Sequence, residues 1–120
     1  EGIDYLLPVP LFSSRLRQRG YNQSELLARG ISRVTGIPLC TDAVVRSRNN
    51  ATQTHKSGYA RWQNVDRLFL STPHAANLHD KHILLVDDVL TTGATLVACA
   101  DALLGVENIK ISVLTLAWAR

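Results

Sequence analysis

The residues with the clearest capacity for chemistry stand together late in the chain. Asp87 and Asp88 end an apolar run, and a hydroxyl-rich loop follows, Thr91-Thr92-Gly93-Ala94-Thr95. Two adjacent carboxylates repel each other unless a cation or the hydroxyl groups of a ligand offset the cost. Backbone N–H groups at a helix start bind phosphate, threonine hydroxyls add donors, and Gly93 lets the backbone approach a ligand closely. The pattern predicts a site for a phosphorylated ligand.

The same residues also allow a structural interpretation. Thr91 or Thr92 can act as the N-cap of a helix, and Asp87-Asp88 can be a solvated turn. Either half of the stretch alone is more often structural than functional. The combination favours a functional site, because carboxylates at the C-terminal end of a buried strand lie where open α/β sheets bind ligands.

The elements that must position this stretch are a strand before it and a helix after it. The apolar run predicts a strand over about 81–87 that is buried on both faces, as in a parallel sheet. A helix is expected over about 93–104, and its predicted buried side comprises Leu96, Val97, Ala100, Leu103 and Leu104. The other expected extended segments are 5–10, 39–45, 68–70 and 109–116. Strand and helix alternate, which predicts an α/β fold, a small parallel sheet flanked by helices on both faces.

A second helix is predicted to begin near Asn22 and to end before Gly36. Asn22 is a good N-cap, and Glu25, three residues later, suggests a capping box. Gly36 is expected to serve as the C-cap residue. The loops at the C-terminal ends of the strands should then meet at one edge of the sheet.

Basic residues gather in two loops, 15–19 and 46–67, rather than in one run. Solvated surface charge is the ordinary explanation, and an anion-binding role is the alternative. The net charge of +3 is modest and fits a polyphosphate ligand as well as it fits nucleic acid. The stretch 47–64 is long and polar, and a loop of this length in a compact domain is usually functional or disordered. We expect a flexible lid over the site, ordered by ligand.

Length and composition describe one globular domain over residues 1–120. The chain has 46% hydrophobic residues, and it contains no apolar run of the roughly 20 residues that a membrane span needs. It does not begin with Met, which predicts a C-terminal fragment of a longer chain. Cys40 and Cys99 are isolated, so neither a disulfide framework nor zinc spacing is indicated. A cytoplasmic location is expected, since no signal peptide is visible.

The order of these motifs resembles a known family. The run Val86 to Thr95 resembles the phosphoribosyl pyrophosphate (PRPP) motif of type I phosphoribosyltransferases. Further segments are similar to the ComF/GntX family within that class: Pro8-Val9-Pro10-Leu11, Arg17 to Gln23, Thr52 to Lys56, Arg61, Asn64 and Val65. One feature of many members, a cysteine-rich segment ahead of this domain that is expected to bind zinc, has no counterpart here.

The resemblance implies a Rossmann-like phosphoribosyltransferase fold and a role for each matched residue. Asp87 and Asp88 would face the ribose hydroxyls, and Thr91, Thr92, Gly93, Ala94 and Thr95 would hold the 5-phosphate. Lys56 and Arg61 would close over the pyrophosphate, with Arg17 and Arg19 near the same group. Mg²⁺ would be held indirectly, through PRPP and close to the acid pair. His55 is more readily a loop residue than a general base.

Three functions remain open at this point: transfer of phosphoribosyl to an unidentified small-molecule acceptor, PRPP sensing without turnover, and an accessory role in DNA uptake. The sequence offers little material for a hood over an acceptor. Aromatic residues make up only 6% of the chain, too few for an obvious base-stacking platform, so direct binding of nucleic acid is not expected. The sequence leaves open whether the chain forms a homodimer.

Overall fold

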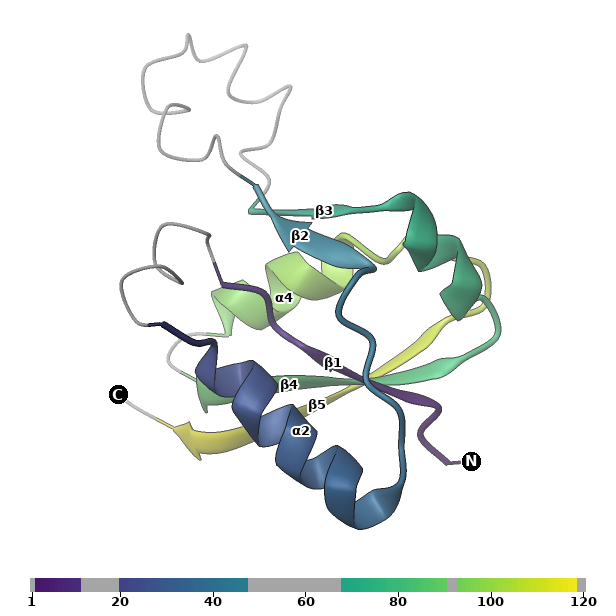
Figure 1. Ribbon diagram of the computed structural model, residues 1–120. Coiled ribbons are helices and arrows are strands. Elements are labelled where there is room, and N and C mark those ends of the chain that lie inside the picture. The colour runs from purple at the N-terminus through teal and green to yellow at the C-terminus, as the bar shows by residue number, and fades with distance from the viewer. Residues whose placement is uncertain (1, 12–19, 48–67, 91–92, 119–120) are drawn as a thin grey trace, which may run out of the picture.

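The centre of the molecule is a parallel sheet of three strands (Figure 1). The computed structural model describes four stretches of the chain, residues 2–11, 20–47, 68–90 and 93–118. The strands of the sheet lie in the spatial order β1 (Tyr5–Pro8), β4 (His82–Leu90) and β5 (Lys110–Trp118). The predicted class, a parallel sheet flanked by helices, is confirmed.

β4 is the middle strand and has partners along both edges. Tyr5 pairs with Ile83 on one side, and His82 pairs with Lys110 on the other. The apolar run was expected to end at Asp87, but β4 continues through both acids to Leu90. The strand is longer than predicted because β5 pairs with it as far as Leu90. The acid pair therefore belongs to the strand, not to the loop after it.

One helix covers each face of the sheet, which Figure 1 shows with α2 in front. Helix α2 (Gln23–Thr35) packs through Ala28 against Leu6 and Val86. Helix α4 (Ala94–Asp101) and the turn after it lie on the other face, in a cluster that includes Leu7, Ile83 and Leu85. Because successive strand residues point to opposite faces, β4 contributes to both clusters.

The buried side of α4 differs in part from the expectation, and the helix ends at Asp101 rather than near 104. Val97 and Leu104 were predicted to be buried, but they are 61% and 69% exposed. Leu96 and Leu103 are buried as predicted, together with Cys99, which was not predicted. Their spacing of three and then four residues places them on one stripe of a helix and the turn after it, and the neighbouring positions point elsewhere.

Two short strands form a separate antiparallel pair, β2 (Val44–Arg46) and β3 (Phe69–Ser71). Of the strand expected over 39–45, only Leu39 forms a β-bridge to the main sheet, at Leu6, and the next residue, Cys40, donates its N–H to the Leu6 carbonyl. After β3, a 3-10 helix (Pro73–Leu78) follows. β2 therefore does not extend the parallel sheet; Val44 of β2 and Phe69 of β3 instead pack in the cluster on the α4 face.

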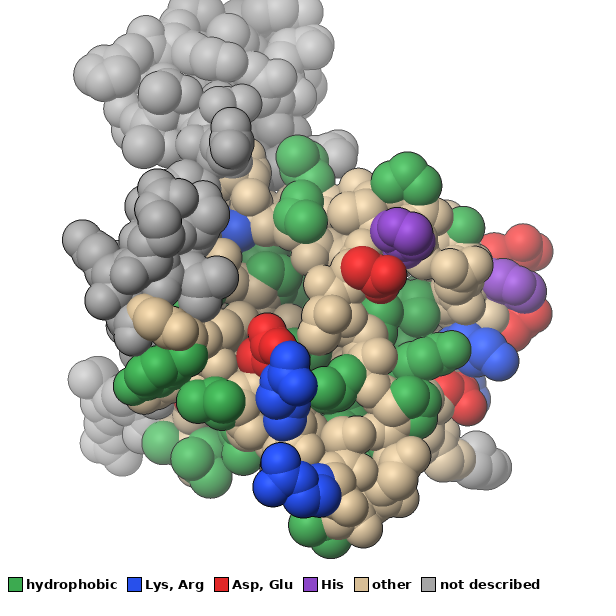
Figure 2. Space-filling view, in the orientation of Figure 1, with side chains coloured by type: hydrophobic (Ala, Val, Ile, Leu, Met, Phe, Trp, Pro, Cys, Tyr) green, Lys and Arg blue, Asp and Glu red, His purple; other side chains and the backbone are tan. Residues whose placement is uncertain are grey.

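The predicted last strand is present as β5, but it is more exposed than its alternating pattern suggested. Val113, Leu114 and Leu116 are all exposed. Figure 2 shows apolar side chains at the surface over the N-terminal part of α2 and over β5. Within the described residues, β5 has a strand partner only in β4. The homodimer remains an expectation that nothing here tests.

Helix α2 is capped at both ends as predicted. Asn22 Oδ1 accepts hydrogen bonds from the N–H groups of Ser24 and Glu25, at 2.9 Å and 3.4 Å. Gly36 ends the helix with a φ of 80°, which favours glycine, and its N–H bonds to the Ser32 carbonyl. The Glu25 side chain pairs with Arg29 at 2.7 Å, so the structure assigns it to an i,i+4 ion pair and not to a capping box.

Asn22 also fixes where α2 begins, because its Nδ2 donates to the Val9 carbonyl at 3.1 Å. We expect Asn22→Ala to lower the free energy of unfolding by about 1–2 kcal/mol, through loss of the cap and of this anchor. Urea denaturation measures the change. Asn77→Ala, at an exposed position of the 3-10 helix, is the matched control. Equal effects of the two substitutions would contradict the capping role.

Candidate functional site

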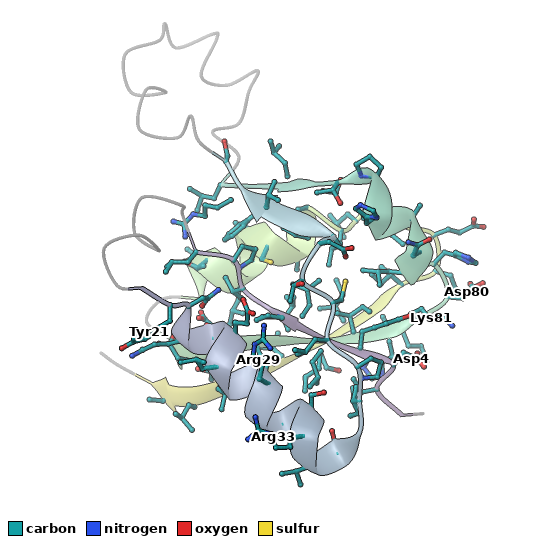
Figure 3. All side chains as sticks on the ribbon, viewed as in Figure 1. Asp4, Tyr21, Arg29, Arg33, Asp80 and Lys81 are labelled. Carbon is teal, nitrogen blue, oxygen red and sulfur yellow. The ribbon has the colours of Figure 1, made fainter. Side chains whose placement is uncertain are left out.

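The carboxyl end of the sheet brings together the end of β1, the start of α2, the acid pair of β4 and the start of α4. Figure 3 shows Tyr21 at the beginning of α2, and it shows Asp4, Asp80 and Lys81 at the opposite end of the sheet. The element order therefore places the start of α4 and the first turn of α2 at the edge where α/β sheets bind ligands.

Asp87, Asp88 and Ser24 form a connected polar group at this edge. The Ser24 hydroxyl donates to Asp87 Oδ1 at 3.0 Å and lies 3.5 Å from Asp88 Oδ1. The backbone N–H of Asp88 reaches both the Ser24 hydroxyl, at 3.2 Å, and Asp87 Oδ1, at 3.0 Å. The first turn of α2 is thus bonded directly to the acid pair on β4.

The Asp87 carboxyl is partly withdrawn from water, and its titration reflects this. Burial raises the pKa of Asp87 above its ordinary value of 3.8, and the neighbouring Asp88 carboxyl raises it further. The hydrogen bonds from Ser24 and from the Asp88 N–H act in the opposite direction. An ionised Asp87 is therefore costly without a ligand, which is the situation that donors on a ligand would relieve.

Cys99 lies within the electrostatic reach of the same group but cannot act as a nucleophile. Burial raises the pKa of its thiol to about 12; the charge of Asp87 raises it too, and Arg46 lowers it. Only the thiolate is nucleophilic, so this side chain is a packing residue. Arg46 itself lies over the Phe69 ring, 5.1 Å from its centroid.

The start of α4 is formed by three residues of the predicted phosphate loop, Gly93, Ala94 and Thr95. Gly93 is the N-cap, and its φ of 85° lies in the left-handed region that L-residues with a side chain rarely adopt. Gly93 has no side chain and therefore supplies no side-chain cap to the helix start. The role of these residues in binding phosphate stays a prediction.

Six predicted site residues fall outside the described stretches, so the structure gives no test of their positions: Arg17, Arg19, Lys56, Arg61, Thr91 and Thr92. The same holds for most of the stretch 47–64, expected as a lid. The structure therefore brings Asp87 and Asp88 together with the α2 start, and it describes the helix start at Gly93.

Ser24 was not predicted as a site residue. It is 4% exposed, although it stands in the polar start of a helix where serine is commonly solvated. The available signal was its place two residues after the Asn22 cap, which the first turn of α2 turns toward the sheet. That signal alone could not separate a contact with the acid pair from ordinary capping.

Cavities that described residues line lie near both ends of the sheet. One of about 160 Å³ is beside the carboxyl end, and its walls include Pro10, Asn22 and Glu25. A larger one of about 470 Å³ is lined by residues such as Thr72 and Glu107. The Glu107 carbonyl accepts from the N–H of Asp80, which places the larger cavity at the amino end of the sheet, away from the acid pair.

No helix within the described stretches has the length and apolar character to cross a membrane. Within the same residues, no three His, Cys, Asp or Glu side chains gather closely enough to hold a metal ion by themselves. Any cation at the acid pair would need further ligands from elsewhere.

Comparisons with known proteins agree on one domain type. The family model for the phosphoribosyl transferase domain matches residues 21–119. A solved purine phosphoribosyltransferase from Pyrococcus horikoshii has a similar fold, with a TM-score of 0.52 over 98% of this chain and 70% of that one. Sequence identity to it is 15%, so this likeness speaks for the fold alone.

Curated relatives are similar over most of the chain. Competence protein F of Haemophilus influenzae is 38% identical over 88% of this chain and 47% of its own length. DNA utilization protein YhgH of Escherichia coli is 38% identical over 84% of this chain and 43% of its own. Competence protein ComFC of Bacillus subtilis is 35% identical over 82% and 38%. The chain spans less than half the length of these relatives.

Proposed function

The chain belongs to the phosphoribosyl transferase domain family, in its ComF group, and on that premise we propose that it binds PRPP and transfers the phosphoribosyl group to a small-molecule acceptor. The observation that carries the proposal is the acid pair of β4, bonded to the start of α2 at the carboxyl end of the sheet. That pair presents carboxylate oxygens where a sugar with two adjacent hydroxyls would need them.

In the proposed reaction, the bond between C1 of the ribose and the pyrophosphate oxygen breaks, and its electron pair leaves with pyrophosphate. A lone pair of the acceptor forms the new bond to C1, and the acceptor loses a proton. The transition state is cation-like at the sugar, so fixed negative charge near the ribose stabilises it. Asp87 and Asp88 would accept hydrogen bonds from the ribose hydroxyls and orient the ring.

The phosphate end of the ligand would lie at the start of α4. Gly93 leaves the backbone open to close approach, and the N–H groups of Ala94 and Thr95 belong to the first turn, where a helix favours anions. Thr91 and Thr92 would add hydroxyl donors. Arg17, Arg19, Lys56 and Arg61 are proposed to bind the pyrophosphate, and that assignment rests on the sequence motif alone.

Mg²⁺ fits this site only as a partner of the ligand. Two carboxylates are too few for a cage made of protein, so the ion would be held through the phosphates of PRPP and water, near the acid pair. When bound, the ion would neutralise charge on the leaving pyrophosphate. Asp87 and Asp88 would lie close to it while they hold the ribose.

The test is calorimetric binding of PRPP, with and without Mg²⁺, followed by an assay for pyrophosphate release with candidate bases. We expect PRPP to bind and Mg²⁺ to strengthen the binding. Ribose 5-phosphate is the matched control ligand, since it lacks the pyrophosphate and should respond little to Mg²⁺. A folded chain that binds no PRPP would refute the proposal, and binding without turnover would favour a sensor.

The names of the relatives favour a second candidate, an accessory role in DNA uptake. Competence protein F and DNA utilization protein YhgH carry those roles in their names. For this chain we expect at most weak binding to single-stranded DNA near physiological salt, with competition by PRPP. Fluorescence anisotropy over a salt series measures it, because the slope counts the phosphates that are neutralised. Tight binding that ignores PRPP would place the DNA role first.

A further inference from the structure

Ser24 is a buried hydroxyl that links two elements far apart in the sequence. It stands in the first turn of α2, is 4% exposed, and bonds to a carboxylate 63 residues away. The helix start that carries it is itself fixed, because Asn22 accepts from the Ser24 N–H and donates to the Val9 carbonyl. The hydroxyl therefore has a defined position relative to β4.

The hydrogen bonds around Ser24 involve one carboxylate oxygen of Asp87, Oδ1, and not the other, Oδ2. The single hydroxyl proton of Ser24 goes to Asp87 Oδ1 at 3.0 Å, and Asp88 N–H donates to the same oxygen at 3.0 Å. Asp88 N–H also reaches the Ser24 oxygen at 3.2 Å, which closes a small ring of bonds. Neither the Ser24 hydroxyl nor the Asp88 N–H bonds to the other oxygen, Asp87 Oδ2.

We propose that Ser24 is a positioning residue for the ligand site: it holds Asp87 in one orientation, with Oδ1 turned to α2 and Oδ2 left for a ribose hydroxyl. The inference rests on the proposed function for the identity of the ligand. A carboxylate that is already oriented loses less side-chain freedom when it binds, so part of the ordering cost is met in the folded chain.

A purely structural role of Ser24 would have different measurable consequences from a positioning role. As a satisfied buried hydroxyl, Ser24 would stabilise the junction between α2 and β4, and its loss would lower stability without changing the ligand's contacts with Asp87. A positioning role predicts two further changes, one in the titration of Asp87 and one in PRPP affinity. Both can be measured separately from stability.

The experiment compares Ser24→Ala, Ser24→Thr and the control Ser32→Ala. Threonine keeps the hydroxyl, whereas alanine removes it. Ser32 lies two turns further along the same helix, and in the described structure its hydroxyl makes no bond to either acid. Thermal unfolding first establishes that each variant is folded, and carbon NMR then follows the Asp87 carboxyl of the ligand-free chain through a pH titration.

Ser24→Ala should raise the pKa of Asp87, because a donor to its carboxylate is lost. The other groups near this carboxyl stay in place: Asp88 on the same strand, and on the α4 side Cys99, whose thiol also lies within reach of the Arg46 charge. PRPP affinity should fall about two- to tenfold, because binding must then order the Asp87 side chain. Ser24→Thr should restore both properties to near wild-type values, and Ser32→Ala should change neither.

Two outcomes separate this inference from the function on which it rests. If the wild type binds PRPP and Ser24→Ala binds it equally well, the positioning role is wrong while the proposed function stands. If the wild type binds no PRPP, the proposed function is wrong, and an Asp87 titration that is unchanged in Ser24→Ala would then overturn the orientation of Asp87 by Ser24 as well.

Discussion

Replacement of both acids of β4, Asp87→Asn together with Asp88→Asn, is expected to weaken PRPP binding by about 2 kcal/mol, roughly thirtyfold. Asparagine keeps the size and one acceptor oxygen, but it removes the charge that strengthens hydrogen bonds from the ribose hydroxyls. Calorimetry with Mg²⁺ present measures the change. Asp101→Asn, at an exposed position at the end of α4, is the matched control and should leave the affinity unchanged.

The loss of binding should not be a loss of fold. The folded-state pKa of Asp87 is raised above 3.8, so the folded chain holds this proton more tightly than the unfolded chain does. Stability therefore falls as the pH rises from the ordinary pKa through the raised one. Asp87→Asn removes that cost, and thermal unfolding at neutral pH should show no decrease. A large decrease would mean that the acid is structural, contrary to our proposal.

Leu85→Ala should have the largest effect on stability, a decrease of about 2–5 kcal/mol in the free energy of unfolding. Leu85 is fully buried in the middle of β4, within the cluster on the α4 face. Its truncation leaves a cavity that two neighbouring strands and a helix cannot readily fill. Urea denaturation of the purified chain gives the difference.

Val97→Ala is the matched control for Leu85→Ala, since it also removes apolar volume but from an exposed face of α4. Its expected effect lies within about 0.5 kcal/mol of zero. The helical pattern alone predicts a buried Val97 and a cost several times larger. The pair of variants therefore tests the observed exposure of Val97 on α4 as well as the core.

The sequence was sufficient for the fold class because its strongest signals are local and agree with one another. A short apolar run bounded by charge indicated the central strand, and Asn22 and Gly36 marked both ends of α2. The length of β4 could not be predicted, because it depends on β5, whose pairing extends the strand to Leu90. A pattern along one segment carries no information about the length of its neighbour.

The same limit explains which residues of the candidate site could be predicted from the sequence. Adjacent acids and a Thr/Gly loop are visible in one stretch, so Asp87, Asp88 and Gly93 could be proposed directly. Ser24 joins them only through the packing of α2 on the sheet, across 63 residues. Its place two residues after the Asn22 cap is compatible with that contact but does not distinguish it from ordinary capping. Burial is the property that distinguishes it, and burial belongs to the folded chain.

The pairing of β1 with β4 also has a consequence for how the chain is made. The N–H of His82 bonds to Asp4 across 78 residues, and this contact lies at the amino end of that pairing. At a synthesis rate of about 5–20 residues per second, β1 is synthesised roughly 4–16 seconds before its partner strand. During this interval the apolar residues Leu6 and Leu7 have no sheet to join. Closure of so long a loop also slows refolding. The carboxyl end of the sheet can therefore assemble only after β4 has been synthesised. If translation stopped before that point, β1 would be left as an unpaired apolar strand, which chaperones would have to shield.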